Sequence, residues 1–193
     1  MSVDSDQSLA RCRHILEESQ RVHTALAALA AEVHRAASIV HHCLEGGGYL
    51  LFCGNGGSAA DSQHLAGEFV GRFKATRGPL PAIALPSNAC VTTAVGNDSS
   101  FDEIFSRQVE AFGRPGDVLL AFSTSGRSRN VVLAAECAKR RGLSVIGFSG
   151  EDGGPLEPLC DILLAVPSSN VPRVQEAHIT LGHALCELVD LWY

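Results

Sequence analysis

The chain has 193 residues, of which 46% are hydrophobic, and it carries a net charge of -6 at pH 7. This length can bury one substantial core, so we predict a single domain, and no apolar run approaches the ~20 residues that cross a bilayer. The acidic balance and the lack of a Lys/Arg cluster argue against nucleic acid or a membrane as partner, and the absence of a signal peptide predicts a cytoplasmic protein.

Helical and strand-like segments alternate along the chain. Two helical stretches end near residue 45, further segments of helical period lie at 58–71, 102–112 and 128–141, and a last one runs from about 173 to the C-terminus. Five short apolar runs separate them, at 49–53, 82–85, 118–122, 144–148 and 162–166. This alternation is typical of a parallel sheet covered on both faces. We therefore predict an α/β three-layer sandwich with a five-stranded parallel sheet and long N- and C-terminal helices.

The terminal helices carry alanine and leucine on more than one face. Such helices pack either against another copy of the chain or against their own sheet, and the sequence alone favours neither. The seven cysteines stand singly and form no C-x-x-C pair, so we predict neither a disulfide framework nor a cysteine zinc site.

A glycine-rich loop, CGNGGSAADSQHLAGE at 53–68, follows the first apolar run. Gly54, Gly56 and Ala59 fit the G-x-G-x-x-A pattern of a dinucleotide fold. That fold also needs a carboxylate at the end of the second strand, where this sequence has PSN at 86–88. The missing carboxylate argues against a nicotinamide enzyme.

A second loop of similar design follows the third apolar run. Its sequence, AFSTSGRSRNVV, places four hydroxyl residues around Gly126: Ser123, Thr124, Ser125 and Ser128. Serine and glycine are also common helix caps, which is the plainer explanation for one such loop. Two loops at the carboxyl edge of a parallel sheet, each opening a helix, instead favour a bound phosphate. Hydroxyl donors without added positive charge suit a small sugar phosphate.

Four motifs now resemble a known family. GNGGSAADSQHLAGE at 54–68, AVGND at 94–98, FSTSGRS at 122–128 and RVQEAHITLGH at 173–183 resemble the sugar isomerase (SIS) domain, and within it the phosphoheptose isomerase family, from about residue 45 to the end. The resemblance implies a single SIS domain over 1–193 with a flavodoxin-like sheet, and a homotetramer that uses residues 1–45 in packing and oligomerisation. It also implies conversion of sedoheptulose 7-phosphate to D-glycero-D-manno-heptose 7-phosphate, for the synthesis of nucleotide-activated heptose.

Histidine and carboxylate residues supply a candidate metal site. His64 and Glu68 are four apart and share a helix face, although such a pair is more often solvated than metal-bound. The resemblance implies that Gln175 and His183 join them around one zinc ion per subunit, and these ligand types suit zinc. Gln175 and His183 lie ~12 Å apart along a helix, so both must lean inward or a neighbouring subunit must supply one ligand. His178 lies off their face, which predicts a packing or interface role.

An aldose-ketose isomerase moves a proton between adjacent carbons through an enediol, and this requires a base and an acid. The resemblance assigns proton abstraction from C1 of the open-chain ketose to Glu68 and proton delivery at oxygen to His183. A nitrogen bound to zinc cannot donate a proton, so either the metal exchanges ligands during turnover or it is partly structural. The four hydroxyl residues are predicted to hold the phosphate. The other predicted substrate contacts are Asn55, Gly56, Gly57, Ser58, Glu68, Arg72, Asn97, Asp98 and Gln175.

Two rival functions share the fold. One is a non-catalytic SIS protein of the replication-initiator-associating type, which has Asn in place of His183 and Thr in place of Gly57. The other is an isomerase of a different sugar phosphate. The residues at 57 and 183 favour the isomerase over the regulatory protein.

Overall fold

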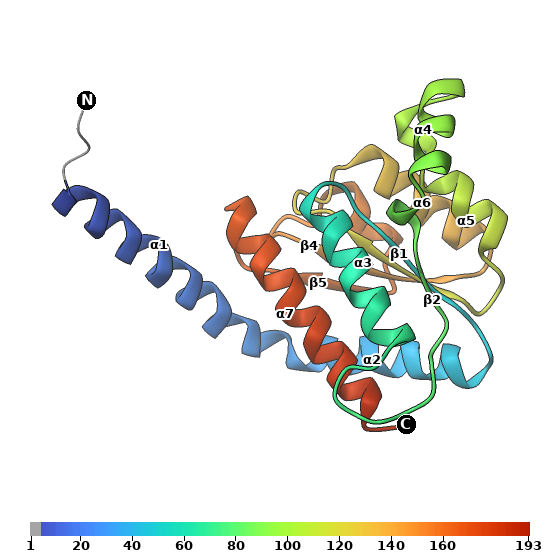
Figure 1. The fold of residues 1–193 in the computed structure, drawn as a ribbon, viewed down its shortest axis with the longest axis horizontal. Coiled ribbons are helices and arrows are strands. Elements are labelled where there is room, and N and C mark those ends of the chain that lie inside the picture. The colour runs from blue at the N-terminus through green and yellow to red at the C-terminus, as the bar shows by residue number, and fades with distance from the viewer. Residues whose placement is uncertain (1–4) are drawn as a thin grey trace.

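The computed structural model describes residues 5–193 and contains one five-stranded parallel sheet in that range (Figure 1). The strand order is β2-β1-β3-β4-β5. This order is flavodoxin-like: successive strands are added on one side of β1 up to β2 and on the other side from β3 onward, and parallel sheets bind ligands at this switch in strand order. The predicted sheet is confirmed, with strands β1 Leu50–Cys53, β2 Ala82–Ala84, β3 Val118–Phe122, β4 Ser144–Ser149 and β5 Ile162–Ala165.

The helices agree closely with the sequence prediction, with one exception. They are α1 Ser5–Ala25, α2 Ala30–Glu45, α3 Gly57–Val70, α4 Ala89–Asp98, α5 Ser106–Phe112, α6 Arg129–Arg140 and α7 Val171–Asp190. The sequence did not predict α4. None of its residues is buried, so it lacks the apolar stripe by which an amphipathic helix is found.

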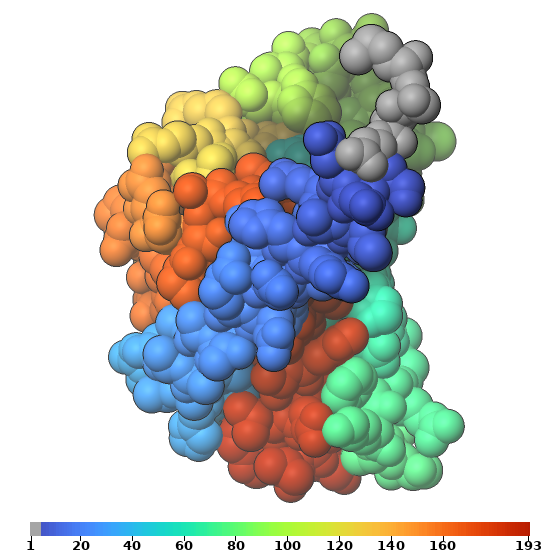
Figure 2. All heavy atoms as spheres, turned by 90° about the vertical axis from the view of Figure 1, so that its left-hand side faces the viewer, coloured from blue at the N-terminus to red at the C-terminus, as the bar shows by residue number. Residues whose placement is uncertain are grey.

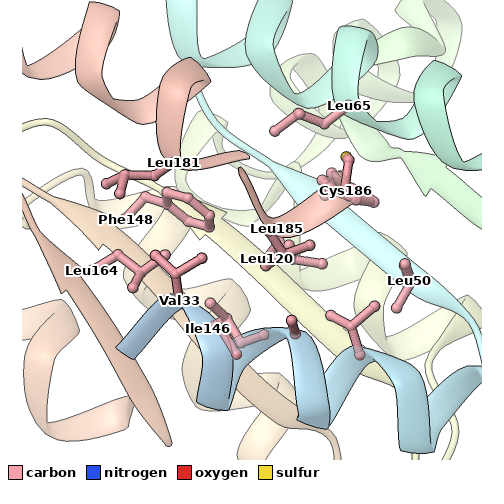
Figure 3. Close-up of a cluster of buried hydrophobic side chains, with 14 of the residues drawn as sticks. Val33, Leu50, Leu65, Leu120, Ile146, Phe148, Leu164, Leu181, Leu185 and Cys186 are labelled. Carbon is pink, nitrogen blue, oxygen red and sulfur yellow. The ribbon is translucent and has the colours of Figure 1, made fainter. Parts of the chain in front are cut away.

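Helices cover both faces of the sheet, which confirms the three-layer sandwich. The odd and even positions of β3 separate the two cores: Leu120 and Phe122 face α2, α3 and α7, whereas Leu119 and Ala121 face α5 and α6. Figure 3 shows the first core, where Leu185 of α7 lies by Leu120 and Leu181 lies beside Phe148. Because every residue of β3 is buried, its sequence is continuously apolar rather than alternating.

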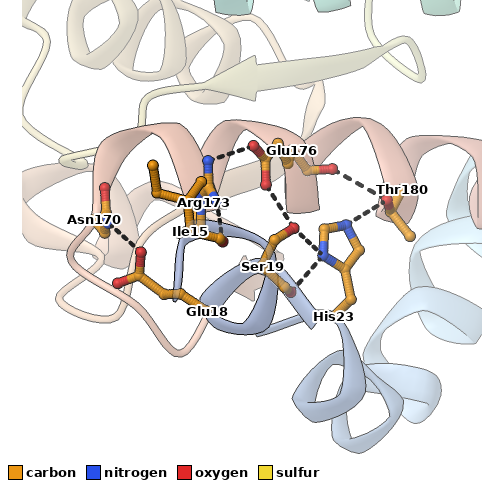
Figure 4. A network of polar contacts seen from close by, with 8 residues as sticks. All are labelled: Ile15, Glu18, Ser19, His23, Asn170, Arg173, Glu176 and Thr180. Carbon is orange, nitrogen blue, oxygen red and sulfur yellow. Dashed lines mark hydrogen bonds and ion pairs between the residues drawn. The ribbon is translucent and has the colours of Figure 1, made fainter. Parts of the chain in front are cut away.

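The N-terminal helix α1 packs along α7 through polar contacts (Figure 4). Ser19 donates a hydrogen bond of 2.8 Å to Glu176, and Arg173 donates one of 2.8 Å to the Ile15 carbonyl. Figure 2, in which the left-hand side of Figure 1 faces the viewer, shows α1 in blue lying across α7. Leu9 and Leu16 of α1 remain exposed. Within residues 5–193, no helix is long and apolar enough to cross a membrane.

His178 is fully buried, as its position off the ligand face predicted. Its Nε2 donates a hydrogen bond of 3.1 Å to the Ser149 carbonyl, while its Nδ1 has no hydrogen-bond partner among the described residues. Its ring meets Phe122 and Phe148 edge-on. Burial lowers the pKa of His178 from 6.5 to about 4, and the bond to Ser149 only partly opposes this.

This histidine predicts an acid-sensitive stability. Because the folded pKa is lowered, the unfolded chain takes up a proton first as pH falls through 6.5, and stability is lost progressively until about pH 4. The contribution corresponds to a loss of about 2 kcal/mol between about pH 7 and pH 5. Urea unfolding at the two pH values measures it. His178→Leu should remove this part of the slope, because leucine does not titrate. The variant should still fold, because the Ser149 carbonyl still accepts a hydrogen bond from the Val166 amide. Equal slopes in both proteins would contradict the assignment.

Candidate active site

Two parallel helices, α3 and α7, bring the candidate catalytic residues together. Gly182 of α7 lies directly against Leu65 of α3, where an added Cβ would stand 2.5 Å from a leucine methyl. This close approach of the two backbones places the next residue, His183, beside His64. The missing side chain at position 182 is therefore what allows residues 119 positions apart in sequence to meet.

His64, Glu68 and His183 form one group. The two Nε2 atoms of the histidines are 2.9 Å apart, and a Glu68 carboxylate oxygen lies 3.3 Å from Nε2 of His64. The group is open to solvent on one side, because the His64 side chain is 49% exposed and the Glu68 side chain 24%. A base and a histidine thus converge at a position that a small substrate can reach.

The geometry of this group fits a divalent metal ion. Its three ligand atoms lie within 4.8 Å of one another. Tetrahedral zinc with bonds of about 2.1 Å holds its ligand atoms about 3.4 Å apart, close to the two shorter distances in the group. Two unprotonated imidazole nitrogens facing each other at 2.9 Å would also need a cation or a shared proton between them.

Burial and the neighbouring His64 favour a neutral His183. Burial lowers the pKa of His183, positive charge on His64 lowers it further, and the Glu68 carboxylate opposes both effects. A neutral imidazole is the form that binds a metal, and it is also the form that can accept a proton.

Gln175 lies at the N-terminal end of the helix pair. Its side-chain amide rests against Gly57, where an added Cβ would stand only 1.7 Å from Nε2. Gly57 and Gln175 thus belong to one contact, two helical turns before His64 on α3. A cavity of about 370 Å³ lies beside them and is lined by Asp61, Pro172, Gln175, Glu176 and Ile179. The role of Gln175 as a metal ligand stays a prediction.

Asp61 is a residue of this cavity that the sequence did not single out. It is buried, and its Oδ2 has no hydrogen-bond partner within residues 5–193. Burial raises the pKa of Asp61 to about 6, although His64 lowers it in part. Its place one turn before His64 was the only available signal, and a lone aspartate on a helix is too common to be read as functional.

The first glycine loop is fixed by a pair of amides. Asn55 and Asn130 exchange two hydrogen bonds of 2.8 and 2.9 Å, which join the end of β1 to the first turn of α6. Gly56 stands at the N-cap position of α3 and offers no capping side chain. Ser58 is buried in the first turn. The predicted contacts of Asn55, Gly56 and Ser58 thus lie at an open helix N-terminus, which favours an anion or a hydroxyl.

The second loop, residues 123–128, lies beside the first loop at the N-terminus of α6, and we call it the hydroxyl loop after its four hydroxyl residues. Ser123 donates a hydrogen bond of 3.0 Å to the Ser128 hydroxyl, and the Arg127 amide donates one of 3.2 Å to Ser125. Ser128 occupies the N-cap position, yet its side chain caps no amide of the helix. Thr124 and Ser125 line a cavity of about 250 Å³. The capping explanation is therefore weakened, because the hydroxyl of Ser128 is directed to its neighbours instead.

Gly126 is required by the shape of this loop. Its φ of 64° is left-handed, and an added Cβ would stand 1.9 Å from the Gly153 carbonyl oxygen. Any other residue would displace the loop, because backbone atoms cannot yield as a flexible side chain does.

Asn97 and Asp98 lie apart from the group of His64. Asn97 donates a hydrogen bond of 2.8 Å to Asp98 at the exposed end of α4, and Figure 1 shows α4 apart from α3 and α7. Arg72 is exposed just after α3. Their predicted substrate contacts remain predictions for this chain.

The fold and the grouping of residues at its carboxyl edge define an SIS-type α/β domain. Residues 14–150 match the SIS domain family. The phosphoheptose isomerase of Rhodospirillum rubrum is 54% identical over 161 residues, covering 83% of this chain and 86% of that protein. That of Burkholderia pseudomallei is 46% identical over 188 residues, covering 96% and 95%.

A solved structure shows the same similarity. The phosphoheptose isomerase from Francisella tularensis has a TM-score of 0.92 at 39% identity, and the match covers 95% of this chain and 98% of that one. The chain belongs to the SIS domain family and, within it, to the phosphoheptose isomerases. The resemblance drawn from the four motifs is confirmed.

Proposed function

We propose that the chain converts sedoheptulose 7-phosphate to D-glycero-D-manno-heptose 7-phosphate, the first step toward nucleotide-activated heptose. The observation that carries this function is the Glu68 carboxylate beside His64 and His183, at the sheet edge that also holds the hydroxyl loop. Relatives named phosphoheptose isomerase over most of the chain support the same substrate.

Glu68 acts as the base on the open-chain ketose. Its carboxylate removes a proton from C1 to form the enediol and returns the proton to C2, so that one group serves both carbons. His183 delivers a proton at the C2 oxygen and takes up the proton that leaves the C1 oxygen as the new carbonyl forms, so it ends the cycle in its starting form. The reaction is thereby balanced without an external oxidant or reductant.

Zinc is the metal that we assign to His64, Glu68, Gln175 and His183. When bound, it would polarise a substrate oxygen as a Lewis acid. The nitrogen and oxygen donors, without thiolates, suit zinc or a similar ion.

The substrate is held at both ends. Ser123, Thr124, Ser125 and Ser128 bind the phosphate at the N-terminus of α6, where the helix dipole adds to their hydroxyls. The first loop and Gln175 position the sugar hydroxyls, with Asn97, Asp98 and Arg72 as further contacts. Fixing both ends of an open chain is worth a large rate factor in proton transfer.

A homotetramer is the assembly we propose, in the cytoplasm. The apolar side chains that α1 leaves exposed, Leu9, Ile15 and Leu16, support burial against a second copy. An apolar groove of about 610 Å³ between α2 and α7 supports the same conclusion. We expect such packing to complete the site with the exposed residues of α4.

The function is tested by isomerisation of sedoheptulose 7-phosphate by the purified protein, with added zinc and with a chelator. We expect turnover that the chelator abolishes and zinc restores. Metal-independent turnover would keep the enzyme and remove zinc from the chemistry. No turnover under either condition, from a folded oligomer, would favour the non-catalytic regulatory protein.

Replacing both Ser125 and Ser128 by alanine should weaken phosphate binding. Each hydroxyl lost removes one hydrogen bond to a charged group, so we expect a rise in KM of about 10-fold or more with a smaller change in kcat. Steady-state kinetics measures both constants. Ser106→Ala, on α5, is the matched control. An unaltered KM would place the phosphate elsewhere.

A further inference from the structure

An aromatic ring covers one side of the catalytic histidine. Phe73 lies in the segment between α3 and β2 and stacks on His183, with ring centroids 5.2 Å apart and an interplanar angle of 29°. His64 meets the same imidazole from another direction, at 5.1 Å and 57°. The His183 ring is thus held between a phenyl ring and a second imidazole, and its rotation is restricted.

A buried ion pair holds the segment that carries Phe73. The Asp190 carboxylate, at the end of α7, accepts hydrogen bonds of 2.8 Å from the amides of Lys74 and Ala75. Its other oxygen accepts one of 2.7 Å from Nε of Arg77. The two charged side chains are only 3% and 5% exposed, although the segment itself runs over the surface.

The same arginine reaches the backbone of the catalytic base. Nη2 of Arg77 donates a hydrogen bond of 3.0 Å to the Glu68 carbonyl, and Nη1 donates one of 2.9 Å to the Phe69 carbonyl. These carbonyls belong to the last turn of α3, which lacks intrahelical partners. One guanidinium therefore links the end of α3, the loop of Phe73 and the end of α7.

Asp190 is well suited to remain charged in this position. Burial alone would raise its pKa, but the amides of Ala75 and Lys74 together with Arg77 outweigh burial and lower it. A paired and fully hydrogen-bonded buried charge gives geometric definition more than net stability.

We propose that Phe73, Arg77 and Asp190 are positioning residues of the isomerase: the ion pair fixes the loop and the backbone of Glu68, and Phe73 sets the orientation of the His183 ring toward the Glu68 carboxylate. The inference rests on the proposed function for its kinetic consequence. It also predicts a metal-binding consequence, because a ligand held in one orientation binds a metal more tightly.

The first test replaces Phe73 and leaves the ion pair intact. In Phe73→Leu we expect kcat for sedoheptulose 7-phosphate to fall about 10-fold with KM nearly unchanged, and zinc affinity to fall by a similar factor. Phe73→Tyr keeps the ring and should restore both values. Phe112→Leu is the matched control, because Phe112 is an exposed phenylalanine on α5, away from the site. Zinc affinity is measured by competition with a chromophoric chelator.

The second test removes the charge of the pair. Asp190→Asn should lower kcat and zinc affinity in the same direction as Phe73→Leu, with a lower melting temperature as well. A loss of melting temperature alone, with kcat and zinc affinity kept in both variants, would overturn the proposal in favour of a purely structural pair.

The two readouts separate this inference from the proposed function. If the wild-type protein binds zinc but does not isomerise the heptose phosphate, the proposed function is refuted. The zinc affinities of Phe73→Leu and Asp190→Asn then still test the positioning role. Turnover without zinc leaves the kcat comparison as the test. A wild-type protein with neither turnover nor zinc binding would overturn both.

Discussion

The Glu68→Gln variant is expected to lose roughly 1,000-fold in kcat for sedoheptulose 7-phosphate, within the range by which a positioned base accelerates a reaction. An amide has the size of the carboxylate but cannot accept the C1 proton. Because the Glu68 side chain is partly exposed and forms its one ion pair in the described chain with His64, the substitution leaves the core and the α3–α7 contact intact. Melting temperature and oligomeric state should therefore stay close to wild type.

The matched control is Glu110→Gln, an exposed glutamate on α5 whose nearest cation, Arg107, is 3.9 Å away. It should keep wild-type turnover. Exchange of the C1 proton with solvent, measured as uptake of deuterium from D2O, separates the chemical step from substrate binding. Retained exchange in Glu68→Gln would remove Glu68 from the role of base.

The sheet could be predicted from the sequence because buried parallel strands are continuously apolar. All five runs proved to be strands, and the two loops that follow β1 and β3 lie at the same edge, as parallel topology requires. The pairing of His64 with Glu68 also followed from helical spacing alone. Local patterns sufficed wherever the structure depends on burial and period.

The contacts that join distant segments left no such pattern. Asn130 holds Asn55 across 75 positions, and Asp190 holds the loop at Lys74 across 116. The sequence also does not indicate that Arg77 is buried beside Asp190, because exposure cannot be read from a polar loop sequence. The meeting of His64 and His183 was named through the family resemblance, and its physical cause, Gly182 against Leu65, became visible only in the structure.

His183 is assigned two roles, metal ligand and proton donor, that one ring nitrogen cannot fill at the same time. Nε2 of His183 faces Nε2 of His64, and so this atom is the one that a shared ion would engage. Gln175 rests on Gly57, at the N-terminal end of the helix pair and two turns from His64. Three candidate ligands, His64, Glu68 and His183, therefore lie together apart from Gln175, whose place among the ligands stays a prediction. A zinc site with three protein ligands keeps a position for substrate.

The second large effect is expected in His183→Asn, which introduces the residue of the non-catalytic regulatory type. We expect kcat to fall roughly 1,000-fold, because the proton donor at oxygen is lost and general acid catalysis supplies up to this factor. Zinc affinity should fall as well, since one of the three clustered ligands is removed. The fold should persist, because His183 is only partly buried and its neighbour Gly182 is unchanged.

Saturating zinc distinguishes the two roles of His183 in this variant. If His183 only holds the metal, excess zinc refills the site through His64 and Glu68, and turnover returns. If it delivers the proton, the metal returns and turnover does not, which is the result we expect. His42→Asn, an exposed histidine on α2, is the matched control and should behave as wild type. Full recovery of kcat with zinc would therefore reassign His183 to metal binding alone. The proton transfer at oxygen would then fall to another group of the cavity beside Gln175. Asp61, whose pKa burial raises to about 6, would be the next residue to replace.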